Sequence, residues 1–111
     1  MKIEILGLEG CPNVAPAVEH ARAALQNLHI RAEISEVNME AGQSIQAAFL
    51  GSPTIRVNGL DVEVAARMAK EFGFGCRTYV VNGLRQGTPP QEWIEAAICE
   101  ALRKDHHAQE I

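Results

Sequence analysis

The chain has 111 residues and a formal net charge of −4, which predicts one domain with a core large enough to fold without disulfides or metal ions. Its 47% hydrophobic and 22% charged residues argue against disorder, and it has no apolar run near the about 20 residues of a membrane span. Aromatic residues make up 5%, and Arg103-Lys104 is the strongest basic cluster, so we expect neither a membrane nor a nucleic-acid partner.

The first third of the chain predicts a β-α-β unit. Residues 2–6 alternate polar and apolar side chains and stop at Gly7, as a strand does. A loop over 8–13 leads into a helix that Asn13 is placed to cap. The apolar residues of this helix recur every three or four positions, at Val14, Val18, Ala21, Leu25 and Leu28. Residues 30–37 alternate again, which predicts a second, parallel strand.

Further helices and strands are expected in the rest of the chain, separated by glycine, proline and asparagine turns. In chain order these are a short helix from about Glu40 to Phe49, a strand over 54–57, a helix from Asp61 to about Phe72, a strand over 76–81 and a helix from Pro90 to about Arg103. The order predicts an α/β fold, a mixed sheet with helices on both faces. We expect one domain over 1–104 and a flexible polar tail over 105–111.

Three cysteines direct attention to thiol chemistry. An odd number does not make a disulfide framework, and Glu4 falls where the apolar region of a signal peptide would lie. We therefore expect a cytoplasmic protein with reduced thiols. The sequence has no Cys-x-x-Cys pair and no phosphate-binding glycine loop, so we expect no metal and no cofactor.

Cys11 is the first candidate functional residue. It lies between a predicted strand and a predicted helix, where unpaired amides and the positive end of the helix dipole stabilise a thiolate. The neighbouring Glu9 opposes this effect. We expect Cys11 to be partly exposed and to be the most reactive of the three thiols, with Cys99 a bystander. The alternative is a small half-buried residue in a turn.

Pro53 is the second candidate. A proline that enters a short β-branched strand after a β-α-β unit can follow a cis peptide bond. The backbone beside it would then be presented next to the thiol, for pairing with an extended substrate. The alternative is a trans proline that only ends the preceding helix.

Together these residues resemble the thioredoxin-fold superfamily over most of the chain. Cys11-Pro12 matches the nucleophilic end of the family's Cys-x-x-Cys motif, Ser52-Pro53-Thr54 resembles its cis-proline loop, and Asn58-Gly59 resembles the turn after the next strand. The resemblance implies a mixed four-stranded sheet and a cis Ser52–Pro53 bond. Residues 60–75 form a long connection where the family has a tight turn, so we also expect an inserted helix or loop between strands three and four.

A narrower resemblance is to small bacterial thioredoxin-like proteins labelled alkylmercury-lyase-related, a group from which no firm activity carries over. It rests on four segments: Glu9-Gly10-Cys11-Pro12-Asn13, residues 49–59, Cys76-Arg77-Thr78-Tyr79 and Pro89-Pro90-Gln91-Glu92-Trp93-Ile94.

The chain departs from the thioredoxin pattern at Val14, which stands where the second motif cysteine would be. Without that thiol, Cys11 can form a mixed disulfide but lacks the usual internal attack that releases it. Cys76 is a candidate replacement, or else a buried strand residue. The usual antiparallel hairpin of strands three and four would put it about 10–15 Å from Cys11. A parallel crossover through residues 60–75 would bring it close; we favour the hairpin, and the crossover stays open.

The leading functional hypothesis is thiol–disulfide exchange with a protein or a low-molecular-weight thiol or disulfide. Cys11 would attack, Pro53 would position the partner strand, and Cys76 or an external thiol would resolve the mixed disulfide. One alternative is a protein that binds a soft metal or an organomercurial through Cys11 and Cys76. Another is a binding module of thioredoxin-like fold without chemistry. The separation of Cys11 and Cys76 discriminates the first two.

Overall fold

The structure is a computed structural model that describes residues 1–39, 49–69, 72–73 and 75–109, with side chains described as far as residue 104. Most of the helix predicted from Glu40 to Phe49 lies outside these residues. Phe49 itself is described, is fully buried and belongs to neither a helix nor a strand.

The amino-terminal β-α-β unit is as predicted. Strand β1 (Lys2–Gly7) pairs in parallel with β2 (Glu33–Asn38), and helix α1 (Val14–Leu28) connects them. Helix α1 ends where His29 adopts a left-handed conformation, with φ of 55°, and its backbone N–H bonds back to Gln26 O. The alternation of β1 buries Ile3 and Ile5 on one face of the sheet.

Two further strands complete a mixed sheet in the order β2-β1-β3-β4. Strand β3 (Thr54–Val57) runs antiparallel to β1, and the two-residue β4 (Leu60–Asp61) runs antiparallel to β3. The predicted Asn58-Gly59 turn connects them, with φ of 49° and 85°. The sheet is therefore four-stranded and mixed, but its fourth strand is β4 and not the predicted strand over 76–81.

The strand predicted over 76–81 does not join the sheet, because β4 already pairs with the edge of β3 that this strand would need. Only its last part forms a strand, β5 (Tyr79–Val81), which pairs with β6 (Leu84–Gln86) in a separate two-stranded hairpin. Cys76 instead makes an isolated parallel bridge with Ser52, just before β3 begins. The favoured hairpin of strands three and four is wrong, and the parallel crossover describes the backbone better.

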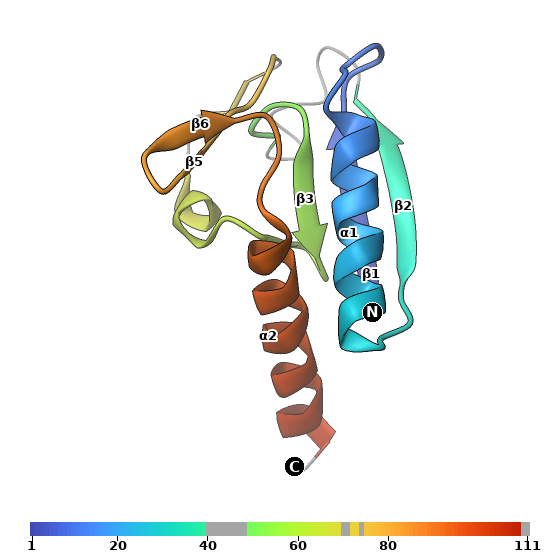
Figure 1. The fold of residues 1–111 in the computed structure, drawn as a ribbon. Coiled ribbons are helices and arrows are strands. Elements are labelled where there is room, and N and C mark those ends of the chain that lie inside the picture. Colours follow the sequence, from blue (N-terminus) through green and yellow to red (C-terminus); the bar gives the residue numbers. More distant parts are fainter. Residues whose placement is uncertain (40–48, 70–71, 74, 110–111) are drawn as a thin grey trace.

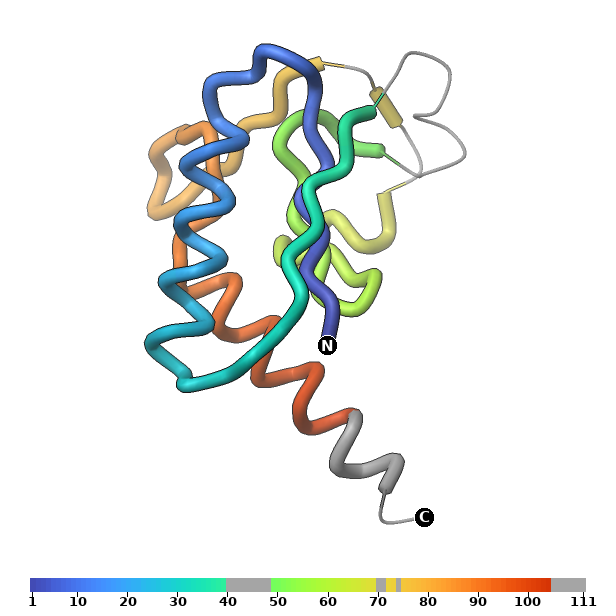
Figure 2. The backbone as a smooth tube through the Cα atoms, turned by 90° about the vertical axis from the view of Figure 1, so that its right-hand side faces the viewer, coloured from blue at the N-terminus to red at the C-terminus, as the bar shows by residue number. Residues whose placement is uncertain are grey.

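The two α-helices of the described residues pack on the same face of the sheet (Figures 1 and 2), so the expected arrangement with helices on both faces is not found in the described part of the chain. Helix α2 (Gln91–Gln109) begins after Pro90 and continues past the predicted end at Arg103. Its Ile94 and Ile98 join the core formed by α1 and the sheet. A smaller cluster of Leu6, Met39 and Phe49 forms separately, and Leu6 faces away from Ile5 because successive strand residues point to opposite faces. None of the described helices is long and apolar enough to cross a membrane.

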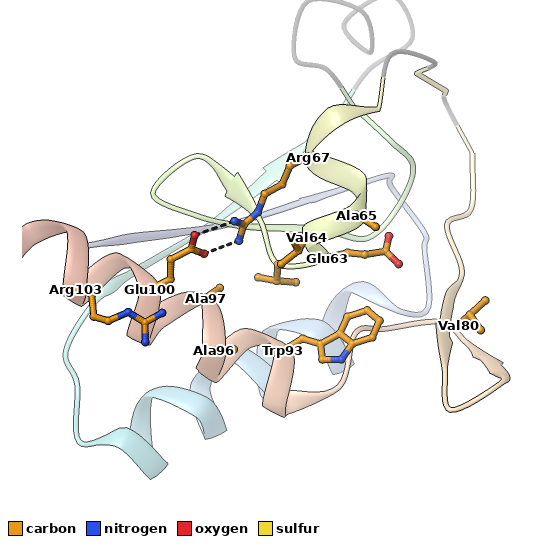
Figure 3. Close-up of a pocket in the computed structure, with 11 residues that line it drawn as sticks. Glu63, Val64, Ala65, Arg67, Val80, Trp93, Ala96, Ala97, Glu100 and Arg103 are labelled. Atoms are coloured by element: carbon orange, nitrogen blue, oxygen red, sulfur yellow. Dashed lines mark hydrogen bonds and ion pairs between the residues drawn. The ribbon is translucent and has the colours of Figure 1, made fainter.

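The helix predicted from Asp61 to about Phe72 is wrong. Asp61 belongs to β4, and the segment that follows forms only a short 3-10 helix, η1 (Val64–Met68). Val64 and Met68 are 68% and 82% exposed. These apolar residues, whose spacing suggested a packed α-helix, therefore do not pack against the core. Figure 3 shows η1 lying across from α2, with Val64 on the side of Trp93.

Candidate functional site

Cys11 lies in the loop just before α1 and is half-buried. Its N–H donates to Leu8 O at 3.0 Å, which closes a turn after β1, and its own carbonyl accepts from Val14 N–H at 3.4 Å. The first turn of α1 carries no acidic side chain, so nothing there neutralises the positive end of the helix dipole near the thiol.

Asn13 occupies the predicted N-cap position but makes no capping hydrogen bond with its side chain. The amide of Asn13 lies instead against Gly87, where a Cβ would stand only 2.5 Å from Asn13 Nδ2. The loop before α1 is therefore held by packing against the chain that leads into α2. The sequence gives no signal for this contact because the two residues are far apart along the chain.

Ser52 connects the Cys11 loop to the segment around Cys76. Its side chain is fully buried, and its hydroxyl accepts a hydrogen bond from Leu8 N–H at 3.0 Å. Its backbone N–H donates to Gly75 O at 2.8 Å, and its carbonyl accepts from Arg77 N–H at 2.9 Å. Ser52 thus contacts the turn that precedes Cys11 and both neighbours of Cys76. The two segments lie at the same end of the fold, the upper end in Figure 1.

Cys76 is exposed, and so is not the buried strand residue that was its alternative. Gly51 makes its position possible. Gly51 has φ of 112°, and a Cβ there would stand 3.0 Å from Arg77 Cβ and 3.1 Å from Gly75 O. A larger residue at position 51 would therefore push the Cys76 segment away from Ser52.

The loop around Pro53 makes hydrogen bonds within the chain. The Ser52–Pro53 peptide bond is cis, as predicted, and Pro53 is fully buried. Its carbonyl accepts from the Tyr79 hydroxyl at 2.5 Å. The backbone N–H and carbonyl of Ser52, the residue before Pro53, are paired with Gly75 and Arg77. The loop therefore positions the chain's own Cys76 segment.

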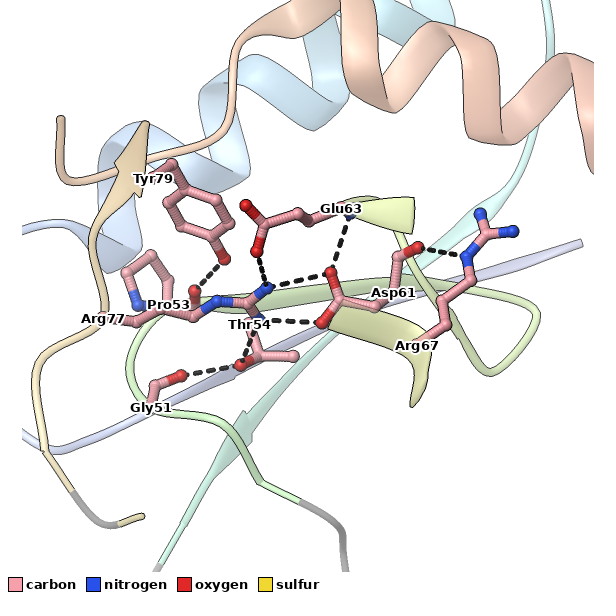
Figure 4. A network of polar contacts seen from close by, with 8 residues as sticks. All are labelled: Gly51, Pro53, Thr54, Asp61, Glu63, Arg67, Arg77 and Tyr79. Atoms are coloured by element: carbon pink, nitrogen blue, oxygen red, sulfur yellow. Dashed lines mark hydrogen bonds and ion pairs between the residues drawn. The ribbon is translucent and has the colours of Figure 1, made fainter. Parts of the chain in front are cut away.

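A buried polar network fixes this segment from its other side (Figure 4). The Arg77 guanidinium bonds both carboxylate oxygens of Asp61, at 2.8 and 3.1 Å, as well as Thr54 Oγ1 at 3.0 Å and Glu63 Oε1 at 3.0 Å. It also lies 4.5 Å from the centroid of the Tyr79 ring. Sequence reasoning missed this network, although an arginine inside a predicted buried strand requires a carboxylate partner.

The charges in the network reinforce one another. Burial alone would lower the pKa of Arg77, but the hydrogen bonds and negative charge of Asp61 raise it overall. Burial raises the pKa of the Tyr79 hydroxyl, which stays protonated and able to donate to Pro53 O. The backbone on the carboxyl side of Cys76 is thus anchored by a permanently charged group.

A cavity of about 350 Å³ lies beside Cys11. Its walls come from the loop after β1, from the start of α1 and from β2, and they include the carboxylate residues Glu9 and Glu36. The half-buried Cys11 is one of the residues that line this cavity. Cys99 belongs to neither segment, since it is a half-buried residue of α2.

Within the described part of the chain, no three His, Cys, Asp or Glu residues gather closely enough to hold a metal ion. Comparison of the sequence and the structure with protein-family models, with curated proteins and with solved structures finds no match.

Proposed function

We propose that the protein is a thioredoxin-like thiol–disulfide exchange protein in which Cys11 is the nucleophile and Cys76 the resolving thiol. The observation that carries the proposal is the double contact of Ser52, with the turn before Cys11 and with both neighbours of Cys76. Cys76 would be the resolving thiol, which the residue at the position of the second motif cysteine, Val14, cannot be.

The reaction has two steps that balance. The Cys11 thiolate attacks a partner disulfide, forms a mixed disulfide with one half, and releases the other half as a thiolate. The Cys76 thiolate then attacks the Cys11 sulfur, which forms a Cys11–Cys76 disulfide and releases the second half. The partner is reduced, the protein is oxidised, and an external thiol restores it. The second step requires the Cα atoms of Cys11 and Cys76 to approach to about 4.4–6.8 Å. The Cys76 side chain is exposed, so no protein group covers the attacking thiol.

One equivalent of dithiodipyridine tests both steps in a Cys99→Ser background. If Cys76 resolves, each chain releases two thiopyridones, and its mass falls by two hydrogens. In Cys76→Ser the reaction should stop after one thiopyridone, with the adduct left on Cys11. Wild-type protein is the control for the background substitution. A stable adduct on Cys11 when Cys76 is present would contradict the proposal.

The same pair of thiols supports a second candidate, binding of a soft thiophilic ion. Two sulfurs at one end of the fold suit a two-coordinate ion such as Hg²⁺. Titration of the reduced protein with Hg²⁺ tests this candidate. It is favoured over thiol–disulfide exchange if one Hg²⁺ binds per chain, if binding needs both thiols, and if the reaction with dithiodipyridine does not release two thiopyridones. A module without chemistry has less support, because the Ser52 backbone that it would offer to a partner is paired within the chain.

A further inference from the structure

A second cavity, of about 670 Å³, lies between α2, η1 and β5 (Figure 3). It is formed by different residues from those around Cys11, and neither Cys11 nor Cys76 lines it. Its volume falls within the about 300–1,000 Å³ that is typical of small-molecule sites. The thiol-exchange proposal does not use it.

The hollow arises from small residues on α2. Trp93, Ala96, Ala97 and Glu100 follow one another at helical spacing along the wall of the cavity. The two alanines leave space opposite η1, where the wall is formed by Val64 and Ala65. Val64 is 68% exposed and Val80, at the far end of the cavity, is 55% exposed. An apolar ligand would therefore remove apolar protein surface from water.

Most of the charged groups on the walls are already paired. Arg67 donates to both oxygens of Glu100, at 2.8 and 3.0 Å, and the Glu63 carboxylate accepts from Arg77 at 3.0 Å. Arg103 is the exception: it lines the cavity and makes no hydrogen bond or ion pair with any described residue. The unpaired charge that the cavity offers to a ligand is therefore positive, at the end toward the carboxyl terminus of α2.

We propose that this cavity binds an apolar monoanion, with its anionic group on Arg103 and its apolar body lying along α2 in the direction of Trp93. The walls suit a hydrocarbon body, because an indole ring, three alanines and three valines form most of them. A cationic ligand is disfavoured, since both wall carboxylates are engaged by arginines.

Two dyes that differ chiefly in one charge test the proposal on the full chain. Anilinonaphthalene sulfonate is an apolar monoanion, and phenylnaphthylamine is its uncharged analogue. Trp93 is the only tryptophan of the chain, so energy transfer from it reports dye bound to the protein, and the filled variants described below show whether that dye lies in this cavity. We expect one site per chain for the anionic dye. Arg103→Gln should weaken its binding about two- to fivefold, as for an exposed ion pair, and leave the uncharged dye unchanged.

Filling the cavity provides the second half of the test. Ala96 and Ala65 are exposed, so Ala96→Leu and Ala65→Leu should fold normally and block both dyes. Ala15→Leu, at an exposed alanine of α1, is the matched control and should bind like wild type.

Three results would overturn the proposal. The first is no binding by wild-type protein, or binding that both filled variants retain. The second is an equal effect of Arg103→Gln on the two dyes. The third is a self-associating chain that Ala96→Leu makes monomeric, because the cavity would then be covered by a second copy.

Discussion

The buried ion pair between Arg77 and Asp61 allows the loss of folding stability on its removal to be predicted. Both side chains are only 6% exposed, so Arg77→Leu would leave the Asp61 carboxylate in the interior without its guanidinium partner. Breaking a buried ion pair from one side costs about 3–5 kcal/mol. A domain of this size has a free energy of unfolding of about 5–15 kcal/mol. We therefore expect Arg77→Leu to remove about a fifth or more of the stability.

Urea unfolding followed by Trp93 fluorescence measures this loss, because Trp93 packs edge-on against Tyr79 with ring centroids 6.3 Å apart. The double variant with Asp61→Leu should lose less than the sum of the two single variants, since neither charge is then left unpaired. Arg22→Leu is the matched control.

The control breaks an exposed pair with Glu19 at 3.4 Å, so it should cost at most about 1 kcal/mol. Equal losses for Arg77→Leu and Arg22→Leu would refute the claim that the network anchors the Cys76 segment.

Two further predictions concern close packing and pH. Gly7→Ala should destabilise the fold by about 1–3 kcal/mol, because its Cβ would stand 2.5 Å from Val14 Cγ2. The Cβ of Gly73→Ala meets no atom of the described residues within 4 Å, so this variant should be near neutral in the same urea assay. The hydrogen bonds from Arg67 lower the pKa of Glu100 below 4.5, so Glu100 contributes stability that is fully present above pH 4.5 and is lost as the pH falls through the lowered pKa. Wild type should therefore be more stable than Glu100→Gln at neutral pH and approach it in acid; a constant difference between pH 7 and pH 3 would contradict this assignment.

The elements that the sequence predicts well are those whose patterns are local. The alternation of residues 2–6 and the three-to-four spacing from Val14 to Leu28 depend only on which face of one element is buried. Neither pattern depends on how the rest of the chain folds. The turns at Asn58-Gly59 and Asn82-Gly83 are equally local, because these residue pairs adopt positive φ at low cost.

The predictions that fail depend on distant partners. Strand β4 has only two residues, too few for any alternation to be visible, yet it occupies the edge of β3. Asp61 precedes Val64 and Met68 at helical spacing, which is typical of a cap, but its carboxylate is bound to Arg77, sixteen residues later. Pairing between residues so far apart leaves no periodic signal in the sequence.

The position of Cys76 follows from these same distant contacts. Since β4 closes the edge of β3, the returning chain can pair with the sheet only before β3 begins, at Ser52. A return in the parallel sense needs a connection of about a dozen residues or more, which a tight hairpin turn lacks and the insertion after Asn58-Gly59 supplies. The connection therefore brings a second thiol to the end of the sheet where Cys11 lies, which is the placement that the proposed exchange reaction requires.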